Sequence, residues 1–220
     1  GFTWHIFINL RYIMDDYFIN LFVVQIIPFL YAFFCLIDYT KNQEDYHNYP
    51  QIREKSLVVA KNVFLYLPVT HFLIFSLFPH EVIFKTGFKE LMFLIMEIIF
   101  TDIYFYTTHR LCHDNHNLYK YIHSKHHEIK DTLGIFAFYC HPIEMVVVNM
   151  GNFYITHMIF RHSYFHTATI AVFGLGNTIL GAHMSNNERG YHQMHHIYRK
   201  CNYGFDLFMD RLLGTEKMPE

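Results

Sequence analysis

Three short runs of the sequence place histidines at spacings suited to metal binding. His109 and His113 are four residues apart, and two further runs each carry histidines at positions i, i+3 and i+4. In a helix these positions share one face, so each run is expected to direct its imidazoles toward a common point. Neutral imidazole binds Fe, Zn, Cu and Ni, and one ion takes at most about six donors. Eight converging imidazoles therefore predict two metal ions. The two longer runs are His123, His126 and His127, and His192, His195 and His196.

The other histidines are expected to be ordinary core or surface residues. His71 and His157 lie in apolar segments, and their role is open: they are either core residues or ligands, for example of a b-type haem. Cys112 lies within the first run but off its histidine face, so it is left out of the ligand set. The isolated histidines expected to be structural are His5, His47, His80, His116, His162 and His166.

Asp102 precedes the first run on the same side of the expected helix. With Tyr106 and His109 it follows helical spacing, so its carboxylate is placed to orient a ligand imidazole. Pairing with a basic group is an equally open role.

The composition predicts a membrane protein. Of the 220 residues, 52% are hydrophobic and 16% are charged, whereas soluble domains carry about 25% charged residues. The net charge of −2 gives no electrostatic reason to expect nucleic acid as a partner. Four widely separated cysteines form neither a disulfide framework nor a zinc ribbon.

Long uncharged runs predict an all-α, polytopic integral membrane protein of four to five transmembrane helices. A helix of about 20 apolar residues crosses the hydrocarbon core, and the ionisable residues Glu97 and Asp102 should face a protein interior. No linker or internal repeat divides the chain, so residues 1–220 are expected to form a single membrane domain. The expected spans are residues 17–37, 62–80, 88–108, 145–160 and 163–187.

Alternating spans would put most of the basic residues on one side of the membrane. Thirteen Lys and Arg would lie on that side and four on the other, the asymmetry expected when the first side faces the cytoplasm or its equivalent. The histidine-rich regions 109–127 and 183–215 fall on the same side. They are therefore expected to form one His-rich helical cap.

The motifs around these histidines resemble those of a known family. The runs HRLCH, HSKHH and HQMHH are similar to the three histidine boxes of the fatty acid hydroxylase and sterol desaturase superfamily. His141, Pro142 and Glu144 match its HPxE element, and Asp210 and Arg211 begin a run like its closing motif. The resemblance extends from about Asp102 to Thr215 and is nearest to the sterol C5 desaturase and C4-methyl sterol oxidase type.

The resemblance implies a nonhaem di-iron site that uses O2 to hydroxylate or desaturate a sterol or fatty-acyl lipid. Zinc at the same ligands stays an alternative, because imidazole suits both metals. Asp102, His141 and Glu144 are expected to support the ligands without binding metal. The chain lacks a cytochrome b5 haem motif and a nucleotide-binding glycine fingerprint, so electrons are expected from a separate carrier such as cytochrome b5. The implied ligands are His109, His113, His123, His126, His127, His183, His192, His195 and His196.

An alternative role is that of a catalytically silent accessory subunit in a larger membrane complex. Tyr191 stands where many relatives have another histidine, Met209 replaces the tryptophan of the closing motif, and only eight residues separate His183 from His192. The expected membrane is that of the endoplasmic reticulum, with the mitochondrial inner membrane as the alternative.

Overall fold

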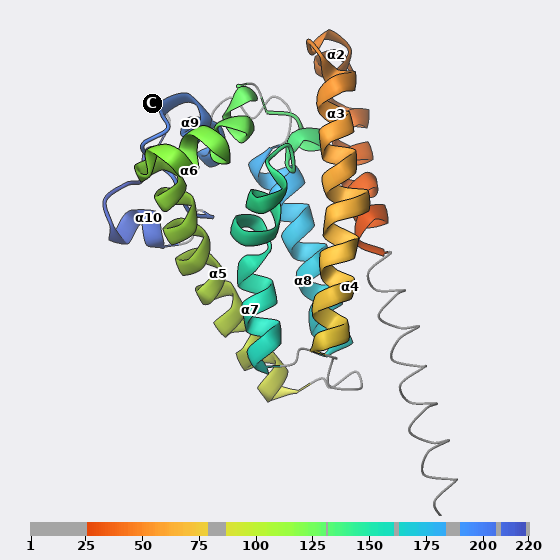
Figure 1. Cartoon of the computed structure of the whole chain (residues 1–220), viewed down its shortest axis with the longest axis vertical. Coiled ribbons are helices and arrows are strands. Elements are labelled where there is room, and N and C mark those ends of the chain that lie inside the picture. Colours follow the sequence, from red (N-terminus) through yellow and green to blue (C-terminus); the bar gives the residue numbers. More distant parts are fainter. Residues whose placement is uncertain are drawn as a thin grey trace, which may run out of the picture.

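The computed structural model describes residues 26–78, 87–130, 132–160, 163–183, 190–205 and 208–218, and these residues form helices without any strand. The predicted all-α class is thus confirmed for this part of the chain. Long helices run side by side, and the short helices α2, α6 and α9 gather at one end of the bundle (Figure 1). The bundle helices are residues 26–41, α3 (Ile52–Lys61), η1 (Asn62–Tyr66), α4 (Leu67–Leu77), α5 (Phe88–Asp114), η4 (Glu144–Asn149), α7 (Gly151–Phe160), α8 (Tyr164–Gly176) and η5 (Asn177–Ala182). The shorter elements are α2 (Gln43–Asn48), α6 (His116–Tyr121), η2 (His123–Glu128), η3 (Gly134–Phe136), α9 (Tyr191–Tyr198) and α10 (Met209–Leu212).

Two described helices are long and apolar enough to cross a membrane. One is the continuous helix Ile52–Leu77, formed by α3, η1 and α4, and the other is α5. At 1.5 Å per residue each is about 40 Å long, which exceeds a hydrocarbon core of about 30 Å. The first helix begins ten residues before the predicted span 62–80, and α5 contains the whole of the predicted span 88–108.

The remaining predicted spans are less regular in the structure. Residues 26–41 are helical, but the first part of the span 17–37 lies outside the described residues. The spans 145–160 and 163–187 correspond to η4 with α7 and to α8 with η5, so each combines a π-helical and an α-helical segment. Residues 184–187 of the last span lie outside the described residues.

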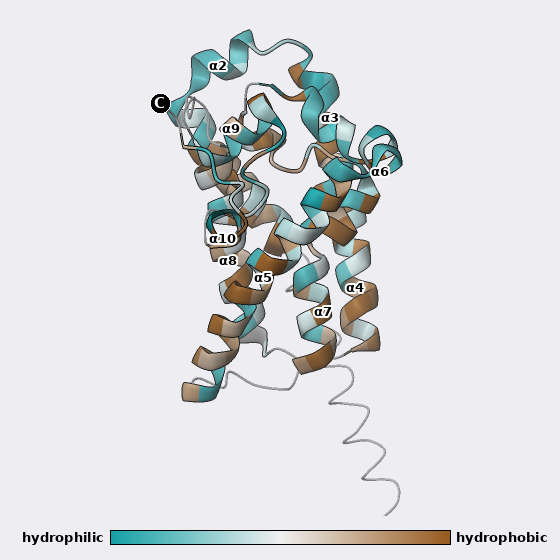
Figure 2. Ribbon diagram, turned by 90° about the vertical axis from the view of Figure 1, so that its left-hand side faces the viewer, coloured by the Kyte–Doolittle hydropathy of each residue, from teal (hydrophilic) through white to brown (hydrophobic). Residues whose placement is uncertain are grey.

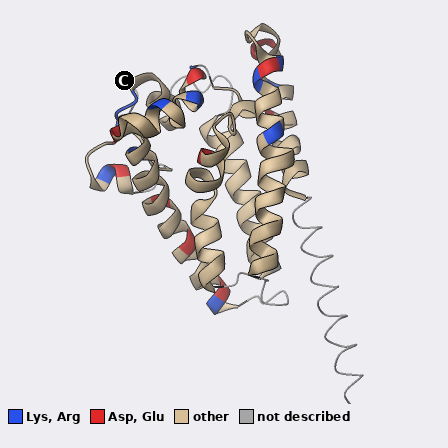
Figure 3. Cartoon of the chain, viewed as in Figure 1, with Lys and Arg blue, Asp and Glu red and all other residues tan. Residues whose placement is uncertain are grey.

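The outer surface of the bundle is apolar over much of its length. Val69, Leu73 and Leu77 follow one another on α4 at intervals of four residues and are 49%, 53% and 70% exposed. In Figure 2, hydrophobic residues are more frequent in the part of the bundle away from α2 and α9 than near these helices. The Lys and Arg of the described residues lie mainly near the end that carries α2, α6 and α9, with one basic position at the start of α5 (Figure 3). This separation suits a bundle with its apolar side in lipid and its polar end in water.

Two buried polar residues of the N-terminal helices fix the segment that follows η2. The carboxylate of Asp38 accepts hydrogen bonds from the Tyr46 hydroxyl at 2.6 Å and from the Gly134 backbone N–H at 2.7 Å. A Cβ at Gly134 would lie 2.7 Å from that carboxylate oxygen, so only glycine permits this approach. Asn62 donates to the carbonyls of Phe138 and Cys140 at 2.8 and 3.0 Å. The chain between η2 and η4 is therefore held against the bundle.

Candidate metal centre

All nine histidines implied as ligands lie together at the polar end of the bundle. They form two neighbouring groups, and within each group the candidate ligand atoms lie within 4.8 Å of one another. Every one of these side chains is buried except His113, which is partly exposed. The five-histidine group consists of His109, His113, His123, His127 and His195. The four-histidine group consists of His126, His183, His192 and His196.

Each box with three histidines divides its side chains between the two groups. In η2, His123 and His127 enter the five-histidine group, whereas His126 enters the four-histidine group. In α9 the division is reversed, because the i, i+4 pair His192 and His196 joins the smaller group and the intervening residue joins the larger one. The expectation that each run points at one common place is therefore wrong. In each of these boxes, the two adjacent histidines belong to different groups.

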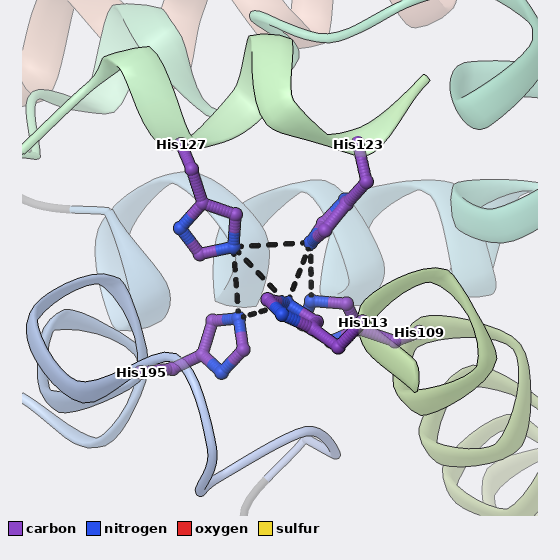
Figure 4. Close-up of side chains that lie close together, drawn as sticks. All are labelled: His109, His113, His123, His127 and His195. Atoms are coloured by element: carbon purple, nitrogen blue, oxygen red, sulfur yellow. Dashed lines mark hydrogen bonds between the residues drawn. The ribbon is translucent and has the colours of Figure 1, made fainter. Parts of the chain in front are cut away.

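The rings of the five-histidine group point their Nε2 atoms toward a shared centre (Figure 4). The Nε2 of His113 lies 2.9 Å from that of His123 and 3.1 Å from those of His127 and His195. The Nε2 atoms of His109 and His123 are 3.1 Å apart. In the smaller group, the Nε2 of His192 lies 3.1 Å from that of His196 and 3.3 Å from that of His126.

The opposite ring nitrogen identifies the tautomer of most of these imidazoles. In six of the nine, Nδ1 lies within hydrogen-bond distance of an oxygen, and in five of these the oxygen is a backbone carbonyl, which can only accept, so that Nδ1 must carry the proton. A neutral imidazole has one N–H, and its Nε2 is then a bare lone pair. The six pairs are His109 with the Tyr203 carbonyl (2.7 Å), His123 with Glu144 (2.8 Å), His126 with the Tyr139 carbonyl (3.2 Å), His183 with the Thr178 carbonyl (2.8 Å), His195 with the Cys201 carbonyl (2.7 Å) and His196 with the Ile129 carbonyl (2.8 Å).

Lone pairs that face one another at about 3 Å repel unless a cation lies between them. Ligands at right angles around an ion with metal–nitrogen bonds of about 2.1 Å would be about 3.0 Å apart, which matches the observed Nε2 separations. The donor set therefore fits one transition-metal ion in each group. Imidazole alone suits Fe, Zn, Cu and Ni, so the residue types leave the metal open.

Burial keeps these imidazoles neutral and ready to bind metal. It lowers the pKa of His192, His195 and His196 well below the usual value, and repulsion among neighbouring histidines lowers each further. Burial lowers the pKa of His126 to about 4. At neutral pH the Nε2 lone pairs are therefore free, and metal binding need not displace a proton from these residues.

Of the three residues predicted to support the ligands, Glu144 contacts one of them directly. Its Oε1 lies 2.8 Å from Nδ1 of His123, and its Oε2 is buried without a partner among the described residues. Burial raises the pKa of Glu144 and lowers that of His123, which disfavours an ion pair in the metal-free protein. A cation bound at Nε2 of His123 would provide a positive charge that stabilises the ionised carboxylate of Glu144.

Replacing Glu144 with glutamine is expected to lower the metal affinity of the five-histidine group by about 10- to 100-fold. The substitution keeps the shape but removes the charge that fixes and strengthens the His123 ligand. Competition with a chelator of known affinity measures the effect. Glu128→Gln is the matched control, because Glu128 is exposed at the end of η2 and bonds to the Tyr139 hydroxyl instead. Equal affinities in the two variants would contradict this role for Glu144.

Asp102 and His141 support the site less directly than predicted. Asp102 accepts backbone N–H bonds from Phe205, Phe208 and Met209, so among the described residues it neither contacts a ligand imidazole nor pairs with a basic group. These bonds hold the segment after α9, whose Tyr203 carbonyl accepts from His109. The Nδ1 of His141 accepts from the Ile143 backbone N–H at 3.2 Å, just before η4.

The other described histidines lie outside the two groups. His71 and His157 both pack against the rings of Phe75 and Phe153, and each lies within hydrogen-bond distance of a backbone carbonyl. This is the environment of core histidines rather than of haem ligands. His47, like His116, is exposed. His5, His80 and His162 lie outside the described residues.

A cavity of about 460 Å³ reaches the four-histidine group from inside the bundle. Its wall includes His126, His183 and His192 but no member of the five-histidine group. Sequence reasoning did not find this cavity, because its wall is assembled from α5, η2, the segment after η3, η4, η5, α9 and the segment after α9. The wall residues are Phe105, His126, Ala137, Phe138, Asn149, Met150, Asn177, Thr178, Gly181, Ala182, His183, Tyr191, His192, Gly204 and Phe205.

Residues 93–215 match the family model described as fatty acid hydroxylase, which is more than half of the chain. A fatty acid hydroxylase of Mycosarcoma maydis is 32% identical over 137 residues, which cover 58% of this chain and 33% of the relative. Sphinganine C4-monooxygenase 1 of Arabidopsis thaliana is 34% identical over 139 residues, covering 55% and 52% of the two chains. Methylsterol monooxygenase 1 of Rattus norvegicus is 42% identical over 55 residues, covering 25% and 18%. The matches thus span about half or less of these relatives, and no solved structure matches.

Proposed function

Because the chain belongs to the fatty acid hydroxylase family, we propose that it is a membrane-bound, O2-dependent di-iron enzyme that hydroxylates or desaturates a lipid. The observation that carries the proposal is the pair of adjacent histidine groups with Nε2 lone pairs aimed at two centres. Two ions fit this arrangement better than one, since nine imidazoles exceed the number of donors that one ion takes. Relatives are named as hydroxylases and monooxygenases, and oxidation by O2 needs a redox-active metal, which favours iron over zinc.

Bound iron would supply the oxidising power, with O2 and two electrons, to attack an unactivated C–H bond. The protein fixes the imidazoles through Nδ1 bonds to five backbone carbonyls and one carboxylate, so the ligands are held in place before metal arrives. Phe105 and Phe205 pack at 4.2 Å between ring centroids beside the cavity and help keep water from it. The chain's own contribution is thus orientation and exclusion of water.

The substrate is proposed to be a lipid, sterol or fatty-acyl, that enters the cavity next to the four-histidine group. The reacting carbon would lie at the wall formed by His126, His183 and His192. The cavity lies among helices whose outer faces are apolar, which suits entry from the bilayer. Hydroxylation and desaturation share the first hydrogen abstraction, so the site serves either outcome.

The proposal also includes the membrane arrangement. Four or five helices would span the bilayer, with Ile52–Leu77 and α5 among them. The His-rich end would lie at the polar side that carries most of the Lys and Arg (Figure 3). A separate carrier such as cytochrome b5 would deliver electrons there, and the membrane would be that of the endoplasmic reticulum.

The test is metal analysis and turnover with the purified protein in lipid nanodiscs. We expect two irons per chain after reconstitution with ferrous iron under argon. We also expect O2-dependent oxidation of an added lipid when a reductase and cytochrome b5 are present. Two bound ions without turnover, together with stable binding to other membrane proteins, would favour the accessory-subunit role instead. Absence of bound metal would reject both the di-iron assignment and the enzyme.

A further inference from the structure

The carboxylate of Asp210 is buried behind the segment that follows α9. Asp210 is 2% exposed, and its side chain accepts from the Tyr203 N–H at 2.9 Å, the Gly204 N–H at 2.6 Å and the Thr215 hydroxyl at 2.7 Å. Because N–H groups only donate, these contacts suit an ionised carboxylate. No Lys or Arg forms an ion pair with it among the residues that the structure describes. The charge of Asp210 is therefore stabilised by hydrogen-bond donors instead of a cation.

One peptide unit connects this carboxylate to the five-histidine group. The carbonyl of Tyr203 and the N–H of Gly204 belong to the same amide. The N–H donates to Oδ2 of Asp210 at 2.6 Å, and the carbonyl accepts from Nδ1 of His109 at 2.7 Å. The Nε2 of His109 lies 3.1 Å from that of His123, inside the five-histidine group. Carboxylate, amide and imidazole thus form a continuous series of hydrogen bonds that ends at this group.

Glycine at position 204 lets two buried carboxylates approach the same stretch of backbone. A Cβ at Gly204 would lie 3.0 Å from Oδ2 of Asp210 and 2.8 Å from Oδ1 of Asp102. Asp102 accepts from the N–H groups of Phe205 and two later residues, which belong to other amides. Both carboxylates therefore hold the segment after α9, but of the two only Asp210 bonds to the amide that contacts His109.

A carboxylate behind a metal-bound imidazole strengthens that imidazole as a ligand. Loss of such a partner lowers metal affinity by about 10- to 100-fold. Hydrogen bonds in series polarise one another, so an intervening amide transmits part of this effect. In the five-histidine group, His123 contacts Glu144 directly, and His109 is connected to Asp210 through the amide. In the four-histidine group, the described oxygen partners of Nδ1 are all backbone carbonyls.

We propose that Asp210 is a positioning residue for the metal of the five-histidine group and acts on His109 through the Tyr203–Gly204 amide. This inference rests on the proposed function in taking a metal ion to bind there. Asp210 would hold the Nδ1 proton of His109 in place through the polarised carbonyl and so keep Nε2 directed at the ion. A bound cation would in turn provide the positive charge that stabilises the buried carboxylate.

The first test compares two variants that each neutralise one buried carboxylate. Asp210→Asn is expected to weaken the binding of one of two zinc ions by about tenfold, the lower end of the range for a directly bonded partner. Asp102→Asn is the matched control, because Asp102 holds the same segment without bonding to the amide, and both of its zinc affinities should stay close to those of the wild type. Competition with a chelator of known affinity, in lipid nanodiscs, measures both ions. A loss in Asp102→Asn as large as in Asp210→Asn would show that Asp210 only holds the segment, and would overturn the proposal.

The second test observes the amide itself, first in the wild type, so it stands even if Asp210→Asn fails to fold. Tyr203 and Gly204 form the only Tyr–Gly pair of the sequence. Protein with tyrosine labelled at the carbonyl carbon and glycine labelled at nitrogen therefore gives one carbon–nitrogen cross-peak in solid-state NMR. Zinc should move both frequencies of this peak, the carbonyl to higher ppm, because a cation at Nε2 strengthens the hydrogen bond from Nδ1.

The variants should separate the same two roles in these spectra. In Asp210→Asn the nitrogen frequency should lose most of its response to zinc, whereas Asp102→Asn should respond as the wild type does. A wild-type cross-peak that stays unchanged when two zinc ions bind would overturn the proposal. Absence of zinc binding would overturn it together with the metal centre. Loss of turnover in the iron-loaded wild type, with both zinc results as expected, would reject only the proposed enzyme.

Discussion

Replacing His195 with alanine is expected to abolish turnover, by at least about 100-fold, and to remove the metal of the five-histidine group while leaving the other metal bound. His195 is fully buried, and its Nε2 lies 3.1 and 3.2 Å from those of His113 and His127. Loss of a residue that supports a ligand lowers metal affinity by about 10- to 100-fold, and loss of the ligand itself should lower it further. Because the two groups have separate ligands, the ion of the four-histidine group should stay bound. Metal analysis should give one ion per chain in place of two.

His126→Ala provides the reciprocal case. It removes a ligand of the four-histidine group, so it should also abolish turnover and leave one ion in the five-histidine group. His47→Ala is the control, since that side chain is exposed and bonds within α2 to the Gln43 carbonyl. If all three variants lose activity and metal equally, the assignment of ligands is wrong. If either ligand variant loses both ions, the two groups bind metal as one cooperative unit.

The ligand candidates could be read from the sequence because helical spacing is local information. His109 and His113 share one face of α5, and both enter the same group. The family membership predicted from the three boxes is confirmed by the match over residues 93–215. The division of each box between two groups could not be predicted. It depends on how η2 and α9 meet in space, and nothing in the spacing of His126 and His127 reveals that.

The features missed by sequence reasoning are those that depend on backbone atoms or on distant elements. The tautomers are fixed mostly by carbonyls, such as those of Tyr203 and Cys201, and a carbonyl leaves no signature in the sequence. The role of Asp102 depends on N–H groups more than one hundred residues away. The sequence prediction placed the start of the helix Ile52–Leu77 too late because residues 53–56 are polar, and hydropathy alone does not show where a helix starts outside the apolar run.

Removal of the metal is expected to make the fold sensitive to mild acid. Burial lowers the pKa of His126 to about 4, whereas a histidine in the unfolded chain titrates near 6.5. Between these values the unfolded state binds more protons than the folded state, so the free energy of unfolding decreases as the pH falls from about 6.5 to about 4. His126 alone accounts for on the order of 3 kcal/mol across this range. His123, His192, His195 and His196 have pKa values lowered in the same direction and add to the effect.

Thermal unfolding followed by far-ultraviolet circular dichroism measures this dependence in protein stripped with a chelator. The midpoint temperature should be nearly constant above pH 7 and fall steeply below about pH 6.5, because protons then compete for the buried Nε2 lone pairs. Zinc-loaded protein should resist acid to a lower pH, since bound metal stabilises the neutral imidazoles until protons displace it. His47→Ala should follow the wild type in both forms. Identical acid profiles with and without zinc would mean that the buried imidazoles do not hold metal, and that the opposed lone pairs need another explanation.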